Sequence, residues 1–363
     1  MKKIIISGGG TGGHIYPAIA IANALKAIDP TIQILFVGAL GKMEMEKVPR
    51  AGYEIIGLPI AGIKRELSVD NISFPFKLTR SLLKARSIIK SFKPDIAIGV
   101  GGFASGPLLM IASLLGIPTL IQEQNSYAGV TNKLLAKRAK AICVAYPNMD
   151  TFFPKNKLKL TGNPVRNDIL EVKSKKEQVY AHFGLQPNHK TLLIIGGSLG
   201  AKTINESIEA GLKLIIDSGY QVLWQTGKPY FERAKTAIEN LKTPYAQAFD
   251  FIYEMDLAYA LADVVVSRAG ALSVSELCLV EKPAILVPFP YASEDHQTKN
   301  AMSLVEQNAA LLVKDKNANE ELVQTALRLL QDADKQLELS KNIKKLAKPN
   351  AAVEIAETVL KLC

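Results

Sequence analysis

Short apolar runs rich in β-branched residues alternate with longer segments of helical periodicity along the chain. A short continuous apolar run is typical of a strand that is buried on both faces of a sheet. In the first half, these patterns predict strands at 3–7, 32–37, 55–58, 96–100, 119–122 and 141–144, and helices at 17–27, 77–91, 108–115 and 130–135. Strands that alternate with helices favour an α/β fold with a doubly wound parallel sheet.

The second half repeats the pattern and predicts a second α/β domain. Its apolar runs predict strands at 191–195, 222–225, 246–249, 264–267, 284–287 and 310–313, and the chain closes on an amphipathic helix at 351–362. After 162–166 the pattern gives way to the lysine-rich stretch 173–178, which predicts a linker or domain edge. A length of 363 residues also suits two domains. We therefore expect domains at 1–163 and 164–350.

The cysteines, the length of the apolar stretches and the net charge exclude some classes of protein and favour others. The three cysteines, Cys143, Cys278 and Cys363, form no CxxC pair, which argues against a disulfide framework or a zinc site and suits a reducing cytoplasm. The longest apolar stretch, 108–121, is shorter than the roughly 20 residues of a spanning helix. The net charge of +10 predicts an anionic partner, either a nucleotide, a nucleic acid or an acidic membrane surface. Against nucleic acid, the basic residues lack interleaved stacking aromatics.

Three glycine clusters each follow a predicted strand and precede a helical segment. They lie at 8–13, 101–106 and 196–200. Glycines let a backbone approach a ligand closely, and the start of a helix offers unpaired amides and a positive dipole end to an anion. For any single cluster, a tight turn without a ligand is an equal alternative. Three such clusters in one chain favour phosphate handling in two nucleotide-binding-type domains.

The first cluster satisfies G-x-G-x-x-G with Gly8, Gly10 and Gly13, so a dinucleotide-dependent dehydrogenase is a rival interpretation. That fingerprint also needs an acidic residue at the end of the second strand to hold the ribose, and the nearest acid is Glu44. The fingerprint is therefore incomplete. His14 follows the cluster at the carboxyl edge of a predicted strand, where the helix dipole disfavours protonation, and is a candidate base.

A second constellation follows the predicted strand 264–267. Glu276 lies one turn into the next helical segment and could accept hydrogen bonds from the two hydroxyls of a ribose. The alternative is a first-turn helix acid that forms a capping box with Ser273. His296 and Gln297, beyond the next strand, could bind sugar hydroxyls. Together these segments predict a nucleotide-sugar pocket in the second half.

Seven stretches, in order along the chain, resemble one family of bacterial enzymes. They are 8–14, 101–107, 122–125, 162–166, 196–201, 268–276 and 295–297. The family is that of the N-acetylglucosaminyltransferases that make the lipid-linked disaccharide-pentapeptide of peptidoglycan, the MurG family. The resemblance implies a GT-B fold, with two Rossmann-like domains facing across a cleft and the closing helix 351–363 packed back on the first domain.

The resemblance also implies an activity and its partners. N-acetylglucosamine would move from UDP-N-acetylglucosamine to the C4 hydroxyl of undecaprenyl-diphospho-N-acetylmuramoyl-pentapeptide, with inversion and without a metal or other cofactor. The enzyme would be peripheral on the cytoplasmic face of the inner membrane, and cell-wall and division proteins are further candidate partners. The only D-x-D, Asp332 to Asp334, lies within the helical pattern 329–339 and is read as a solvated helix face.

The resemblance also implies roles for individual residues in the matching stretches. The donor residues implied by the resemblance are Thr11, Gly12, Gly13, Asn125, Arg166, Ser198, Ile252, Ala271, Leu272, Ser273, Val274, Ser275, Glu276 and Gln297. Glu276 would hold the ribose, Ser198 a phosphate and Ile252 the uracil. The first two glycine loops would face the acceptor diphosphate through Gly10, Gly102, Ser105 and Gly106. His14 would be the general base, and Arg166 with the helix N-termini would stabilise the leaving diphosphate.

A basic segment predicts the membrane face. Apolar residues at helical spacing, among them Phe74, Leu78 and Leu82, accompany basic residues that include Lys77, Arg80 and Lys84, with no acid from 71 to 94. This suits a helix lying on an anionic leaflet. The alternative is a domain helix whose apolar stripe is core.

Other functions stay open at this point. They are a different GT-B lipid transferase such as a diacylglycerol glycosyltransferase, a UDP-N-acetylglucosamine 2-epimerase, and a nucleotide-binding protein without catalytic activity.

Overall fold

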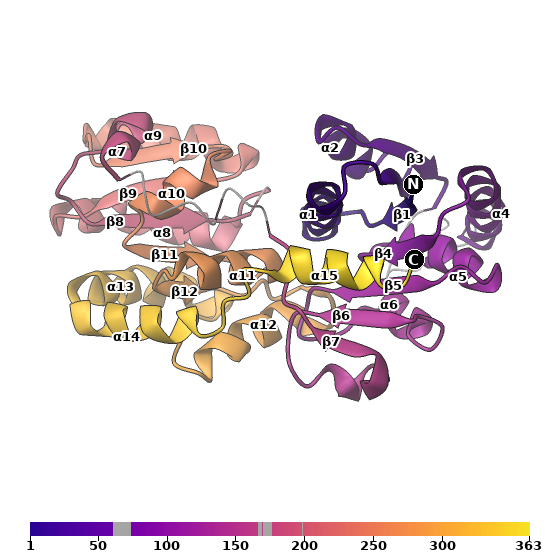
Figure 1. Ribbon diagram of the computed structural model, residues 1–363. Helices are drawn as coiled ribbons and strands as arrows, with labels where there is room; N and C mark the ends of the chain where they lie inside the picture. Colours follow the sequence, from indigo (N-terminus) through magenta and orange to yellow (C-terminus); the bar gives the residue numbers. More distant parts are fainter. Residues whose placement is uncertain (61–73, 166–168, 170–175, 198) are drawn as a thin grey trace. The chain divides into compact units, whose positions relative to one another are not determined.

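The computed structural model describes residues 1–60, 74–165, 169, 176–197 and 199–363. These form two compact units (Figure 1). The first comprises Met1–Arg166 with Lys348–Cys363, and the second comprises Asn167–Ala347. Both junctions lie three residues from the predicted domain bounds.

The first unit is built on a seven-stranded parallel sheet. Its strands are β1 (Lys3–Ser7), β2 (Gln33–Ala39), β3 (Glu54–Leu58), β4 (Ile96–Gly99), β5 (Thr119–Glu123), β6 (Ala141–Val144) and β7 (Leu158–Leu160). The spatial order is β3-β2-β1-β4-β5-β6-β7, and Ile5 pairs with Leu35 on one side and Ala97 on the other. The order reverses between β1 and β4, and in open α/β sheets such a switch point is where ligands bind. The first two glycine clusters follow these two strands.

Helices cover both faces of this sheet. They are α1 (Gly12–Ile28), α2 (Glu44–Arg50), α4 (Phe74–Phe92), α5 (Ser105–Leu114), α6 (Val130–Leu135) and α15 (Ala351–Leu360). One core joins Ile4 and Ile6 of β1 to α1 and α15, while Ile5, which points the other way, joins a second core with α4 and α5. Alternate residues of one strand thus serve two cores, which is why the strands read as continuous apolar runs.

The second unit has a six-stranded parallel sheet in the order β10-β9-β8-β11-β12-β13. The strands are β8 (Thr191–Ile195), β9 (Gln221–Gln225), β10 (Ala246–Phe249), β11 (Val264–Ser267), β12 (Ala284–Leu286) and β13 (Leu311–Leu312). Its helices are α7 (Lys176–Phe183), α8 (Lys202–Asp217), α9 (Phe231–Leu241), α10 (Met255–Leu261), α11 (Ala271–Val280), α12 (His296–Val305), α13 (Ala318–Gln331) and α14 (Ala333–Lys344). The order reverses between β8 and β11, which precede the third glycine cluster and the Glu276 segment.

The predicted fold class is therefore confirmed, while some elements differ. Helix α1 begins at Gly12, five residues before the predicted start, and α2 and β7 were not predicted. Asp332 and Asp334 of the D-x-D are exposed, as predicted, but the predicted helix is interrupted there. Asp332 lies at the junction of α13 and α14, where its carboxylate accepts the Lys335 amide at 2.8 Å and caps α14, and Asp334 lies on the first turn of α14. Among the described residues, no helix combines the length and apolar character needed to span a membrane.

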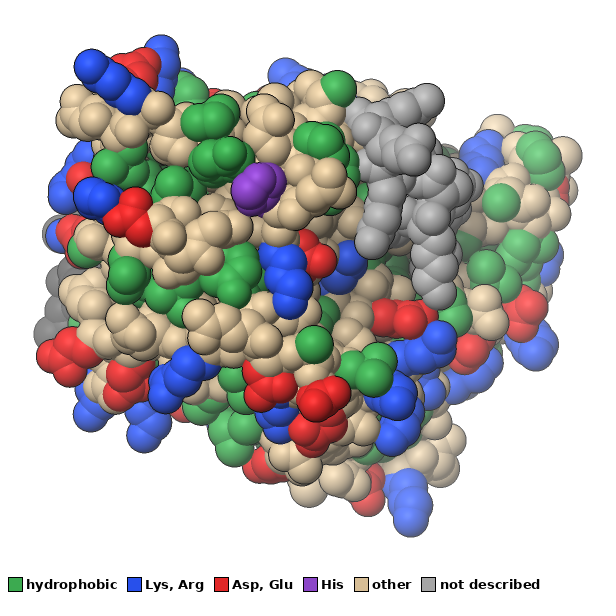
Figure 2. Space-filling view, turned by 90° about the vertical axis from the view of Figure 1, so that its left-hand side faces the viewer, with side chains coloured by type: hydrophobic (Ala, Val, Ile, Leu, Met, Phe, Trp, Pro, Cys, Tyr) green, Lys and Arg blue, Asp and Glu red, His purple; other side chains and the backbone are tan. Residues whose placement is uncertain are grey.

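Charge is divided unevenly between the two units. Of the 44 basic and 34 acidic residues of the chain, the first unit holds 24 and 11, a net charge of +13, and the second holds 20 and 23, a net charge of −3. On the face seen in Figure 2, acidic and basic side chains are interspersed. The attraction to anions inferred from the total charge therefore belongs to the first unit.

Candidate functional site

The first glycine loop places His14 on the first turn of α1, at the switch point of the first sheet. The ring nitrogen Nδ1 of His14 lies 3.1 Å from the carbonyl oxygen of Gly9 and 3.4 Å from Oγ1 of Thr11. A carbonyl oxygen only accepts hydrogen bonds, so a hydrogen bond between these two atoms places the proton on Nδ1. In the neutral ring, Nε2 then carries the lone pair, which is the arrangement that a general base needs.

The start of α1 offers backbone donors beside this imidazole. The amides of His14 and Ile15 both donate to the carbonyl of Thr11. In the part of the chain that the structure describes, no protein acceptor takes the amide hydrogens of Thr11, Gly12 and Gly13. These three residues are among the predicted substrate contacts, and their amides can bind an anion.

The Gly10 amide has a different partner. It donates to Oε2 of Glu44 at 2.9 Å. Gly10 was predicted to face the acceptor diphosphate, but in this structure its amide is directed to a carboxylate of the protein. The loop can therefore contribute the helix-start amides to an anion, and not the Gly10 amide.

The second glycine loop packs directly on the first. Gly101 and Gly102 both have positive φ, and a side chain at Gly101 would meet the His14 ring 2.8 Å from Nε2. A side chain at Gly102 would overlap the carbonyl oxygen of Gly9. Ser105, a predicted diphosphate contact, is fully buried and its hydroxyl donates to the Gly102 carbonyl at 2.8 Å. Its hydroxyl therefore shapes the loop, whereas Gly106 is half-buried at the start of α5.

A buried carboxylate shapes the loop after β5. Glu123 accepts hydrogen bonds from the Asn125 amide at 3.1 Å, the Gly129 amide at 2.9 Å and the Asn132 side chain at 2.8 Å. Asn125, a predicted donor contact, is thus held by a residue that the sequence analysis did not single out. A glutamate on a buried strand was the available signal, since such a carboxylate needs several donors.

In the second unit, one buried glutamine connects two predicted donor segments. Gln225, at the end of β9, donates from Nε2 to the Gly197 carbonyl at 3.2 Å and accepts the Ile252 amide at Oε1 at 3.0 Å. Gly197 belongs to the third glycine loop, and Ile252 is the predicted uracil contact. The predicted residues Ser198 and Arg166 lie outside the described residues.

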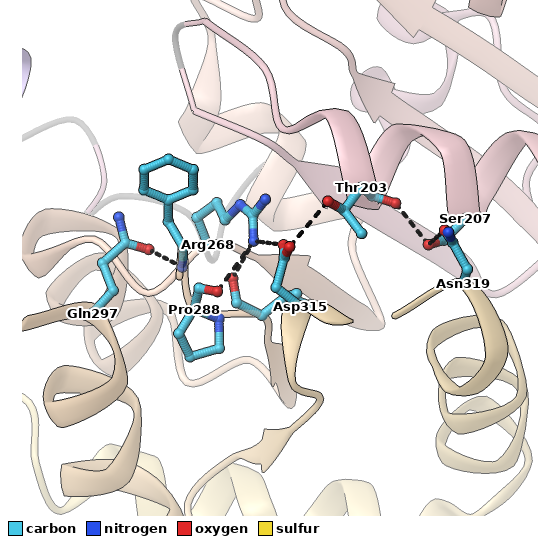
Figure 3. Close-up of polar contacts among 9 residues, drawn as sticks. Thr203, Ser207, Arg268, Pro288, Gln297, Asp315 and Asn319 are labelled. Carbon is cyan, nitrogen blue, oxygen red and sulfur yellow. Dashed lines mark hydrogen bonds and ion pairs between the residues drawn. The ribbon is translucent and has the colours of Figure 1, made fainter. Parts of the chain in front are cut away.

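Arg268 is the centre of a polar network at the carboxyl edge of the second sheet (Figure 3). Its Nη1 donates to the carbonyls of Val287 at 3.1 Å and Pro288 at 3.2 Å, and forms an ion pair with Asp315. Asp315 also accepts from the hydroxyl of Thr203 at 3.1 Å. The network thus ties the ends of β11 and β12 to the segment before α13 and to the first turn of α8.

Helix α11 presents the predicted ribose residue. It begins at Ala271 with Gly270 as its N-cap, so Ser273 lies inside the helix and the capping-box alternative was wrong. Glu276 is half-buried, and its Oε2 accepts the hydroxyl of Tyr259 at 3.0 Å. Tyr259, from α10, was not predicted and orients this carboxylate.

The other predicted residues of the segment differ in exposure. Val274 and Ala271 are buried, while Leu272, Ser273 and Ser275 are half-buried. Gln297, on the first turn of α12, accepts the Phe289 amide at Oε1 at 2.9 Å (Figure 3). Its side-chain amide nitrogen is the group that can still donate to a sugar hydroxyl.

The predicted membrane helix is α4, and its apolar stripe does not face solvent. Leu78 packs against the core with Ala85 and Ile89, while Phe74 and Leu82 are half-buried. The large hydrophobic side chains of α4 that are exposed are instead Phe76 (73% exposed) and Leu83 (65% exposed). The exposed basic residues of the helix are Arg80, Lys84, Arg86 and Lys90, and Lys77 is half-buried.

Comparisons with known proteins agree with this architecture. Residues 4–144 match the glycosyltransferase family 28 N-terminal domain, and residues 191–355 match the glycosyltransferase family 28 C-terminal domain. The chain is 58% identical over 99% of its length to the UDP-N-acetylglucosamine–N-acetylmuramyl-(pentapeptide) pyrophosphoryl-undecaprenol N-acetylglucosamine transferase of Cytophaga hutchinsonii, of which it covers 96%. It is 56% identical over 99% of its length to the enzyme of the same name from Bacteroides fragilis, of which it covers 95%.

Solved structures show the same fold. The crystal structure of Acinetobacter baumannii MurG is similar with a TM-score of 0.81 and 31% identity, covering 99% of this chain and all of that one. A UDP-GlcNAc 2-epimerase from Neisseria meningitidis bound to UDP-GlcNAc is similar with a TM-score of 0.70 and 17% identity, covering 99% and 100% of the two chains. At that identity the second likeness concerns the fold alone.

Proposed function

The chain belongs to glycosyltransferase family 28, and from this premise we propose that it transfers N-acetylglucosamine from UDP-N-acetylglucosamine to the C4 hydroxyl of undecaprenyl-diphospho-N-acetylmuramoyl-pentapeptide. The observation that carries the proposal is the identity of 53–58% with transferases of this name over almost the whole chain, both units included. The product would be the lipid-linked disaccharide used in peptidoglycan synthesis.

The second unit is the proposed donor site. Glu276, oriented by Tyr259, would accept hydrogen bonds from the ribose hydroxyls. Ile252 and the third glycine loop, connected through Gln225, would hold the uracil and a phosphate. Gln297 would donate to a sugar hydroxyl. Arg268 lies at the same edge of the second sheet, but its guanidinium already binds Asp315 and two backbone carbonyls. We therefore assign it a structural role, in which it holds together the loops that follow β11 and β12.

The first unit is the proposed acceptor site, with His14 as general base. The acceptor hydroxyl oxygen would form a bond to C1 of the sugar while the bond from C1 to the UDP oxygen breaks, and the hydroxyl proton would pass to Nε2 of His14. The Nδ1 contact to Gly9 supports this assignment because a hydrogen bond to that carbonyl selects the tautomer whose lone pair is on Nε2. The amides of Thr11, Gly12 and Gly13, which the resemblance assigns to the donor substrate, would bind anionic oxygens of UDP-N-acetylglucosamine.

We also propose that α4 rests on the cytoplasmic leaflet of the membrane, where the acceptor lipid lies. Phe76 and Leu83 would enter the headgroup region, and the neighbouring basic side chains would each contribute about 1 kcal/mol toward anionic lipid. The test is co-sedimentation with vesicles containing anionic phospholipid. Charge reversal at Arg80 and Lys84 should weaken binding, whereas the matched reversal at Lys213 and Lys235 of the second unit should not; equal binding by all variants would contradict the proposal.

The experiment for the activity is radiolabel transfer from UDP-N-acetylglucosamine, against UDP-glucose, into a lipid-linked muramoyl acceptor. Transfer that requires the acceptor supports the proposal. Turnover of the nucleotide sugar without acceptor would favour an epimerase, transfer to diacylglycerol would favour another lipid transferase, and binding of UDP without turnover would favour a non-catalytic protein.

A further inference from the structure

We propose that Glu44 is a positioning residue for His14, acting through the peptide unit that joins Gly9 to Gly10. The proposal rests on the proposed function in that it assigns His14 as the base. Glu44 lies at the start of α2, outside the glycine loops and the predicted site.

Glu44 is fully buried and both of its carboxylate oxygens are held. Oε2 accepts the Gly10 amide at 2.9 Å, and Oε1 accepts the Ala39 amide, at the end of β2, at 2.9 Å. A buried carboxylate is stable only when it has such donors. Two bonds to two separate backbone segments fix its position relative to the sheet and to the first glycine loop.

The peptide unit carries this constraint to the imidazole. Its N–H donates to Glu44, and its C=O, which belongs to Gly9, lies 3.1 Å from Nδ1 of His14, at hydrogen-bond distance. In a trans peptide these two groups point in opposite directions. The peptide unit therefore lies between the Glu44 carboxylate and the His14 imidazole, with one polar group directed to each. Hydrogen bonds in such a chain polarise one another, which strengthens the carbonyl as an acceptor. A carboxylate that orients an imidazole is a common way to fix its tautomer.

The peptide unit between Gly9 and Gly10 is closely packed on both sides. A side chain at Gly9 or at Gly38 would overlap the Glu44 side chain, and a side chain at Gly102 would overlap the Gly9 carbonyl oxygen. The peptide unit therefore contacts Glu44 on one side and the second glycine loop on the other. Gly10 itself has a φ of +89°, a backbone conformation that favours glycine.

The same contacts exclude another use of this acid. In a dinucleotide-binding domain, the acid after β2 accepts hydrogen bonds from the ribose. Here both oxygens of Glu44 accept backbone amides instead. Glu44, the acid nearest to the position that the dinucleotide fingerprint requires, thus binds the first glycine loop instead of a ribose.

The test begins with the unchanged protein. Nitrogen-15 NMR of histidine-labelled protein distinguishes the two imidazole tautomers, and His14→Gln identifies the His14 signals among the four histidines of the chain. At a pH where the ring is neutral, we expect hydrogen on Nδ1. A His14 ring that carries its hydrogen on Nε2 overturns the proposal without any further variant.

The variant is Glu44→Gln, whose side chain can accept only one of the two amides. The matched control is Val48→Ala, which removes buried apolar volume from the same helix without touching the loop. For Glu44→Gln we expect kcat to fall roughly 10- to 100-fold, the KM for UDP-N-acetylglucosamine to stay within about twofold, and the Nδ1-protonated tautomer to lose its dominance. Val48→Ala should lower Tm while both kcat and tautomer stay unchanged.

Two results with the variants would also overturn the proposal. One is a Glu44→Gln protein that keeps the wild-type kcat and tautomer, and the other is a Val48→Ala protein that shows the same losses, since the effect would then come from general destabilisation. If wild-type protein transfers no sugar, the proposed function fails, but the tautomer measurement still decides whether Glu44 orients His14.

Discussion

Removing the Asp315 carboxylate would leave the Arg268 guanidinium buried without its counter-charge. The two side chains are only 11% and 15% exposed, and Arg268 would keep its bonds to two carbonyls. Breaking a buried pair in this way costs about 3–5 kcal/mol. Because the carbonyl bonds remain, we expect Asp315→Ala to lower the free energy of unfolding of the second unit by about 3 kcal/mol, at the lower end of that range.

The assay is urea unfolding followed by tryptophan fluorescence. Trp224 is the only tryptophan of the chain and is fully buried in the second unit, so its emission reports on that unit. With an m-value of about 2 kcal/mol/M, the midpoint should fall by roughly 1.5 M. The control is Thr203→Val, which removes a neutral donor to the same carboxylate and should cost only about 1 kcal/mol.

A double variant identifies the cause. Replacing Arg268 by Met in the Asp315→Ala protein removes the orphaned charge, and should recover at least about 1 kcal/mol. If Asp315→Ala shifts the midpoint by less than about 0.5 M, or if the double variant is no more stable than the single one, the reasoning from buried charge is refuted.

Three further outcomes are expected. His14→Ala should lower kcat by at least about 100-fold while the Kd for UDP, measured by calorimetry, stays unchanged; unaltered turnover would remove His14 as the base. Tyr259→Phe should weaken UDP binding roughly 2- to 10-fold because Glu276 loses an orienting hydrogen bond, with no loss expected for binding of uracil alone. Burial raises the pKa of the Cys143 thiol to about 12, so it stays protonated at pH 8, and iodoacetamide should label exposed Cys363 but reach Cys143 only after unfolding; rapid labelling of Cys143 in folded protein would contradict this.

The strands could be predicted because their residues face two cores. Runs such as 191–195 are buried at every position, so their apolar pattern identified them directly. The early start of α1 was hidden because Gly12 and Gly13 have low helix propensity, and the turn geometry after β1 places them in the helix regardless. Helix α2 is short and contains Pro49, so it has too few turns to show a period.

Long-range contacts explain what was missed in the site. Glu44, Gln225 and Tyr259 each act on segments 17–34 residues away in sequence, and no local pattern indicates such a partner. On α4, periodicity located the stripe but could not say that Leu78 faces inward while Phe76 and Leu83 face outward, since that depends on where the sheet lies.

The last helix of the chain completes the first core. Ile355 and Val359 of α15 pack with Ile15 and Ile21 of α1, and Lys159 donates to the Thr358 hydroxyl at 2.7 Å. During translation, the whole of the second unit is synthesised between α1 and α15, so the core that α1 begins can be completed only after the second unit has been made. A chain that stops before residue 351 would therefore leave the apolar face of α1 uncovered, which is the kind of surface that chaperones bind.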